Sequence, residues 1–156
     1  MRSCAMARTR ILIQAGHQPP LQPGHEDETG AEGERELVVR IQKALVRLLR
    51  ADDRFEPVPM PGRITDGVDV DAALFLANLI AAEFERIPDH PPRRDDNITS
   101  DRAQYYGFGH VETPGPEVLV EHGFVSNPTE HRWLLRNVEA LARAQHVALC
   151  RFFGVR

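Results

Sequence analysis

The sequence has only two cysteines, few aromatic residues and no long hydrophobic run. Cys4 and Cys150 lie near opposite ends of the chain, and neither belongs to a Cys-x-x-Cys pair or a zinc-finger spacing. A disulfide framework and a zinc finger are therefore not indicated. No run approaches the roughly 18 apolar residues of a membrane-spanning helix, and residues 1–15 hold no apolar stretch of signal-peptide length. We therefore expect a chain without a membrane segment that stays in the cytoplasm until something releases it.

The sequence also lacks an excess of positive charge. It has 19 basic against 23 acidic residues, a formal net charge of -4, so long-range electrostatics do not favour a nucleic-acid partner. Hydrophobic residues make up 42% and charged residues 27% of the 156 residues, and these proportions exclude a chain that is mainly disordered. The length suits one domain with a real core, which we expect to be a monomer.

Short apolar runs alternate with helical patterns along the chain. The clearest helix is predicted for residues 34–50, where apolar residues recur every three to four positions opposite a charged face. This alternation predicts a single α/β domain at residues 10–156, after an extension at 1–9, with a largely parallel twisted sheet and helices on both faces. The expected strands are 10–15, 55–60, 72–76 and 117–121, and the other expected helices are 78–87, one from Asn127 and one from about Asn137.

Titratable side chains follow the predicted strands, where ligands bind in open α/β sheets. His17 comes after the first strand, Glu34 opens the first long helix, and Glu121 ends strand 117–121 and is followed by His122. A histidine and two carboxylates on one rim suit a metal-assisted hydrolase, in which side chains hold a Lewis acid and a base takes a proton from bound water. We expect the remaining loop and helix-surface histidines to be solvated: His25, His90, His131 and His146.

These residues also have structural explanations. His17 can simply be a polar residue at a strand exit, and the helix dipole favours Glu34 in a first turn without any metal. Glu121 is harder to explain in this way, because a carboxylate that ends so apolar a strand is costly to bury without a partner. The spacing alone therefore leaves a structural role and a catalytic role open for His17 and Glu34.

Three segments carry motifs in a fixed order: residues 11–17 (ILIQAGH), 33–37 (GEREL) and 117–127 (EVLVEHGFVSN). Together they resemble the three signatures of the zinc-dependent N-acetylmuramoyl-L-alanine amidases of the amidase-3 type, and they span most of the chain. The resemblance implies the catalytic domain of a phage endolysin or of a bacterial cell-wall amidase. Such a domain cleaves the amide between N-acetylmuramic acid and L-alanine in peptidoglycan, which would be the partner of this chain.

The resemblance also implies roles for single residues. By this comparison His17 and Glu34 are ligands of a Zn²⁺ cofactor, and Glu121 is the catalytic carboxylate that activates the metal-bound water. Zinc lowers the pKa of its water to about 7 and polarises the scissile carbonyl, which agrees with these roles. Asn127 would be structural, as the cap of the helix behind the site.

The chain departs from the family at one ligand. The family's second histidine ligand follows the strand that corresponds here to residues 72–76, and no histidine follows this segment. The predicted strand also runs into the predicted helix within one or two residues, whereas βα connections take about 2 to 6 residues. We therefore expect a loop to be deleted or omitted near residues 76–78. His110, which precedes strand 117–121, is the candidate substitute for the missing ligand.

Two other functions stay open at this point. The first is a catalytically impaired, amidase-like module that binds peptidoglycan or regulates its turnover after losing the third zinc ligand. The second is a zinc carboxypeptidase that acts on another amide. Bound metal separates the enzyme from the module, because a catalytic zinc normally has three protein ligands and a water molecule.

Overall fold

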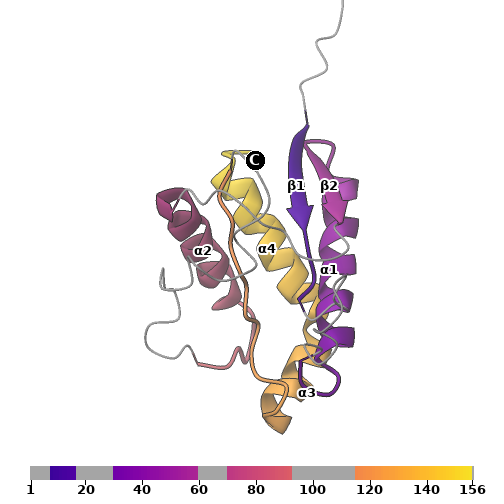
Figure 1. The fold of residues 1–156 in the computed structure, drawn as a ribbon. Coiled ribbons are helices and arrows are strands. Elements are labelled where there is room, and N and C mark those ends of the chain that lie inside the picture. Colours follow the sequence, from indigo (N-terminus) through magenta and orange to yellow (C-terminus); the bar gives the residue numbers. More distant parts are fainter. Residues whose placement is uncertain (1–7, 17–29, 60–69, 93–114, 156) are drawn as a thin grey trace, which may run out of the picture.

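The computed structural model describes residues 8–16, 30–59, 70–92 and 115–155, and this part of the chain is mixed α/β (Figure 1). It contains four helices and a small sheet of two parallel strands. In chain order the elements are β1 (Thr9–Ile13), α1 (Glu34–Ala51), β2 (Phe55–Pro59), α2 (Val70–Phe84), α3 (Pro128–Arg136) and α4 (Val138–Phe152).

The first half of the described chain is a β-α-β unit. β1 and β2 pair in parallel, with Thr9 opposite Phe55 and Ile13 opposite Pro59. The two prolines of β2 cannot donate to the ladder, which suits a strand at a sheet edge. α1 connects the strands and begins after Gly33, whose φ of 79° is in the left-handed region. The predictions of strands at 10–15 and 55–60 and of a helix at 34–50 are confirmed within one or two residues.

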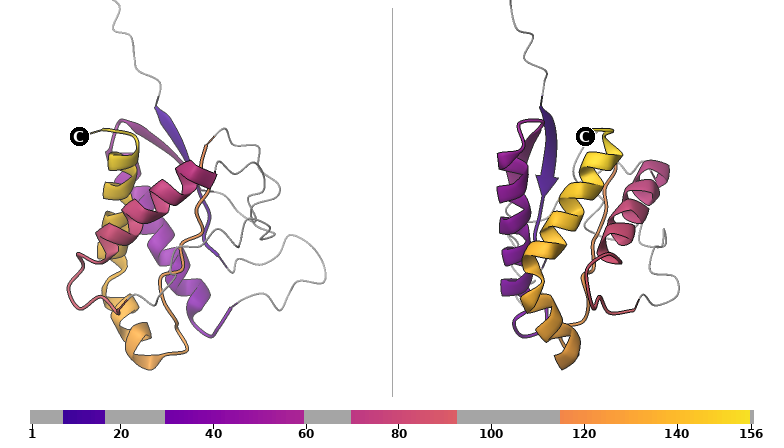
Figure 2. Two further views of the ribbon diagram at one scale, coloured as in Figure 1. Left: turned by 90° about the vertical axis from the view of Figure 1, so that its left-hand side faces the viewer. Right: turned by 180° about the vertical axis from the view of Figure 1, so that it is seen from behind.

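α4 lies between α1 and α2 and contacts both (Figures 1 and 2). Its inner face is formed by small and aliphatic residues, of which Leu141, Ala142 and Ala148 are completely buried. The buried carboxylate of Glu83 on α2 accepts a hydrogen bond from Arg86 at 2.8 Å and pairs with Arg151 of α4. The core therefore depends on three helices that pack together, with the two strands beside α1.

The two C-terminal helices begin as predicted. Asn127 has extended backbone geometry, and its side-chain oxygen accepts hydrogen bonds from the backbone N–H groups of Thr129 and Glu130, at 3.0 and 3.4 Å. Glu130 in turn accepts from the side-chain amide of Asn127 at 2.9 Å. This reciprocal pattern with a proline in the first turn satisfies donors that would otherwise have no partner. The structural role of Asn127 as a helix cap is confirmed.

The predicted strand at 72–76 is wrong, because these residues belong to α2. The apolar run also has helical spacing: Leu76, Ile80 and Phe84, four residues apart, form the buried face of the helix. Short apolar runs do not separate a strand from a buried helix, and the alanines of this run favour the helix. The abrupt strand-to-helix junction that motivated a deletion near 76–78 is therefore absent, and the deletion itself stays a prediction.

The predicted strand at 117–121 is also wrong within the described part of the chain. Residues 116–124 are assigned to no helix or strand there, although Val118 and Val120 pack partly against the core. With 72–76 helical, the described residues provide no neighbouring strand for this segment, and the expected large twisted sheet with helices on both faces is not formed by them. None of the described helices has the length and apolar character needed to cross a membrane.

Candidate functional site

Glu34 lies in the first turn of α1, where its carboxylate caps the turn that precedes the helix. One carboxylate oxygen accepts a hydrogen bond from the backbone N–H of Ala31 at 2.7 Å. The position at the positive end of the helix dipole also favours a carboxylate. These contacts provide a structural reason for Glu34, so its role as a zinc ligand stays a prediction.

Glu121 is exposed on the segment that leads to α3. The sequence argument that this carboxylate is costly to bury therefore does not apply, because its exposed position carries no desolvation cost. Among the described residues, no strand pairs with residues 117–121, so no sheet formed by them covers the end of this segment. An exposed carboxylate can accept a proton from water or from a ligand, so the geometry leaves the catalytic role of Glu121 open.

The side chain of the neighbouring His122 points into the core, where it contacts other side chains. Its ring lies 5.7 Å from that of Phe84, and its Nε2 lies 3.2 Å from the side-chain amide nitrogen of Gln145. An amide nitrogen only donates, so Nε2 accepts and the imidazole is neutral in this arrangement. Burial lowers the pKa of His122 from 6.5 to about 4.

We expect this histidine to make folding stability depend on pH. Because the folded-state pKa lies below the unfolded value, the unfolded chain takes up a proton first as the pH falls. The free energy of unfolding should therefore decrease from about pH 6.5 to pH 4, by at most about 3 kcal/mol. Urea denaturation across this range should show a shallower pH dependence for His122→Gln than for the wild type. Identical slopes in the two proteins would contradict the contribution of His122.

Among the described residues, no group of three potential metal ligands contains Glu34 or Glu121. His17 and His110 lie outside the described residues, so their predicted positions are not observed. Within the described ranges, one group has three metal-ligating side chains whose donor atoms lie within 4.8 Å of one another: Asp52, His146 and Cys150. The described residues therefore do not by themselves complete the zinc site that the resemblance implies, and they form a different group that can bind a metal ion.

This second group joins the end of α1 to α4. Asp52 follows the last turn of α1, and His146 and Cys150 are one turn apart on α4. The Nε2 atom of His146 lies 3.0 Å from Oδ2 of Asp52 and 3.8 Å from Sγ of Cys150. Cys150 Sγ lies 3.9 Å from the same Asp52 oxygen. Because one imidazole nitrogen faces both partners, the group is not a Cys-His-Asp catalytic triad, which needs both nitrogens.

Arg54 is the fourth member of this group. Its Nε lies 2.7 Å from Oδ1 of Asp52 and its Nη2 lies 2.5 Å from Oδ2 and 3.6 Å from Sγ of Cys150. The bidentate contact with Arg54 holds the pKa of Asp52 well below its usual value. Burial is the main reason why the pKa of the Cys150 thiol is raised. Without a metal, the group is therefore an Arg-carboxylate pair beside a neutral thiol.

The expectation that the loop and helix histidines are solvated is wrong for two of them. The His146 side chain is 20% exposed and bound to Asp52, and the ring of His90 packs edge-on against Trp133 at 5.1 Å. The four-residue spacing of His146 and Cys150 was visible in the sequence. Their third partner, Asp52, lies almost one hundred residues away, so no local pattern could reveal it.

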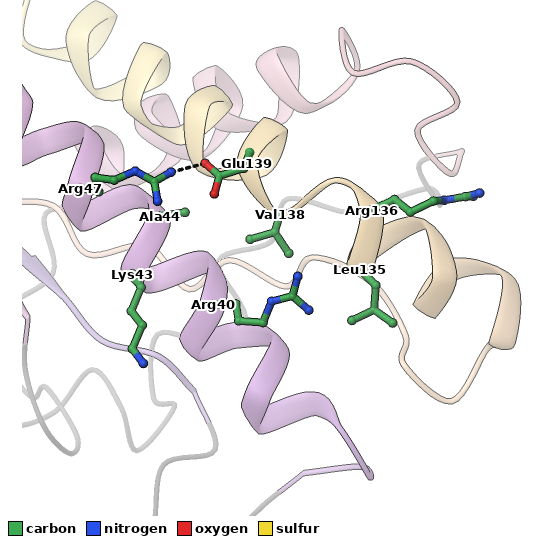
Figure 3. A pocket seen from close by; sticks show the side chains of 8 residues that line it. All are labelled: Arg40, Lys43, Ala44, Arg47, Leu135, Arg136, Val138 and Glu139. Atoms are coloured by element: carbon green, nitrogen blue, oxygen red, sulfur yellow. Dashed lines mark hydrogen bonds and ion pairs between the residues drawn. The ribbon is translucent and has the colours of Figure 1, made fainter.

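A basic groove lies where α1 meets the junction of α3 and α4 (Figure 3). The groove has a volume of about 270 Å³. Glu139 pairs with Arg47, and no ion pair within the described ranges involves Arg40, Lys43 or Arg136. The net charge of the groove lining is therefore positive, opposite to that of the chain, but the side chains of Lys43 and Arg136 point away from each other (Figure 3). The lining residues are Arg40, Lys43, Ala44, Arg47, Leu135, Arg136, Val138 and Glu139.

Comparison of the chain with protein-family models, with curated proteins and with solved structures finds no match. The amidase resemblance therefore depends on the motifs of the sequence alone.

Proposed function

We propose that the chain is a zinc-dependent N-acetylmuramoyl-L-alanine amidase that hydrolyses peptidoglycan. The observation that carries this proposal is the proximity of the second motif to the helix that directly follows the third motif. A Cβ atom at Gly33 would lie 3.6 Å from Cε1 of His131, so the start of α1 contacts α3. Glu34 thus lies next to the helix that directly follows the third motif. β1 ends at the same end of the molecule as α1 begins (Figure 1). In the sequence, His17 follows four residues after the last residue of β1.

The residues have separable tasks in this proposal. His17 and Glu34 hold the zinc, which supplies a water of lowered pKa and polarises the carbonyl of the substrate. Glu121 takes the proton from the attacking water and delivers it to the leaving amine of L-alanine, which is general base and then general acid catalysis. Its exposure suits this task, because a wall polymer has to reach it from solvent.

One observation favours the catalytically impaired module as a second candidate. α2 occupies the segment where the family has a strand followed by a histidine ligand, and none of the residues of α2 is a histidine. The chain would then keep the surface that contacts peptidoglycan and lack the third protein ligand of a catalytic zinc. A protein that binds the purified wall and releases no peptide from it would support this candidate.

The zinc ligand His17 provides the test of the proposal. We expect His17→Ala to lose one zinc equivalent per chain and the release of peptide stems from purified wall. His25→Ala, which changes the next histidine along the chain, should keep both. Metal analysis after dialysis measures the first property, and the appearance of new amino groups measures the second. Unchanged zinc content in His17→Ala would contradict its role as a ligand.

A further inference from the structure

The donor atoms of Asp52, His146 and Cys150 have separations close to those around a tetrahedral zinc ion. Typical zinc bonds of about 2.0 Å to oxygen and nitrogen and about 2.3 Å to sulfur place an N–O pair about 3.3 Å apart and pairs with sulfur about 3.5 Å apart. The observed separations are 3.0 Å between nitrogen and oxygen, and 3.8 and 3.9 Å to sulfur. Small side-chain rotations would bring all three atoms to one ion.

We propose that Asp52, His146 and Cys150 form a second metal site, which binds Zn²⁺ or a similar borderline-soft divalent ion with three protein ligands. The mixed oxygen, nitrogen and sulfur donors favour such an ion over Mg²⁺ or Ca²⁺, which prefer oxygen alone. The i, i+4 spacing of His146 and Cys150 places both side chains on one face of α4. Asp52, next to the end of α1, completes the set from a different element.

The site lies apart from the proposed amidase centre. Asp52 and Arg54 immediately precede β2, which starts at Phe55, so the group is at the amino ends of the strands. Glu34 and the chain leading to His17 lie at the opposite ends. An open depression beside the group is lined by Leu48, Ala51 and Arg143 among others. It gives a water molecule access to the fourth coordination position of the ion.

Arg54 competes with the metal ion for this site. Its guanidinium binds the Asp52 oxygen that also faces His146 and Cys150, so its positive charge lies beside the position that an ion would take. The Arg54 side chain is 34% exposed and can turn toward solvent. On binding, the Cys150 thiol gives its proton to solvent, His146 binds through Nε2 with its proton on Nδ1, and Asp52 binds as the carboxylate it already is.

Cobalt substitution of the full-length protein tests the site through a signal that only a sulfur ligand produces. Addition of Co²⁺ to the metal-free chain should give a sulfur-to-cobalt charge-transfer band. The band should vanish in Cys150→Ser and persist in Cys4→Ser, which is the matched control because the chain has two cysteines. The band should also persist in His17→Ala, so that metal binding at this site is measured independently of the amidase centre. Zn²⁺ should displace the cobalt and remove the band.

Two further variants test the geometry. His146→Ala should weaken Co²⁺ binding by at least about 10-fold, since loss of even an outer-shell partner commonly costs that much. Arg54→Gln should strengthen it by at least about 5-fold, because a like charge close to the ion is removed. Absence of the band in the wild type, its persistence in Cys150→Ser, or its loss in Cys4→Ser would overturn the proposal. Weaker binding in Arg54→Gln would refute the competition.

Discussion

Leu141→Ala should lower the free energy of unfolding by about 2–5 kcal/mol. Leu141 is completely buried in the first turn of α4, the helix that packs against both α1 and α2. Replacing its isobutyl side chain with a methyl group leaves a cavity that the surrounding helices close only in part. Domains of this kind are stable by about 5–15 kcal/mol in total, so the variant should lose a large part of its stability. Urea denaturation followed by circular dichroism should show a lower midpoint with an unchanged slope.

The same substitution at Leu135 is the matched control. Leu135 lies on α3 and is 40% exposed, so its truncation removes little buried surface. We expect Leu135→Ala to change the free energy of unfolding by less than about 1 kcal/mol. Equal effects of the two substitutions would contradict the central position of α4 in the core.

Helices α1 and α3 were predictable because each has two local sequence signals. α1 combines a wide apolar stripe with a charged face over eighteen residues, and α3 begins with a cap, a proline and a glutamate. Both signals are local, and neither requires knowledge of the rest of the fold. β1 was also predictable, because its short β-branched run is followed by a glycine.

The observed conformations of residues 72–76 and 117–121 could not be predicted from their apolar character. A run such as Ala-Ala-Leu-Phe-Leu satisfies a buried strand and a buried helix equally well, and its alanines decide for the helix. For residues 117–121, an extended backbone becomes a strand only when a neighbour pairs with it. Among the described residues no strand pairs with this segment, and another expected strand, at 72–76, belongs to α2.

The candidate sites also differ in whether local sequence patterns could reveal them. Glu34 and Glu121 could be singled out because local sequence patterns place Glu34 at the start of a predicted helix and Glu121 at the end of a predicted strand. The Asp52, His146 and Cys150 group is produced by packing between the end of α1 and the face of α4. The basic groove likewise needs α1 and the α3–α4 junction to meet. Sites of this second kind depend on tertiary contacts and have no local sequence signal.

Glu121→Gln should reduce amide hydrolysis by about 10²- to 10⁴-fold, the usual contribution of a general acid-base group. Glutamine has the same shape and cannot take up the proton of the attacking water. Because Glu121 is exposed, the free energy of unfolding should change by less than about 0.5 kcal/mol. The zinc content should stay unchanged, because Glu121 is assigned as the base and not as a ligand. Glu36→Gln, at another exposed glutamate, should retain full activity.

Mass spectrometry of the soluble products from purified peptidoglycan tests the amidase proposal most directly. The zinc-loaded wild type should release peptide stems that begin with a free L-alanine amino group and leave the glycan chains intact, and Glu121→Gln should release almost none. Products with new reducing sugar ends, stems cut at another amide, or equal release by the wild type and Glu121→Gln would contradict the proposal.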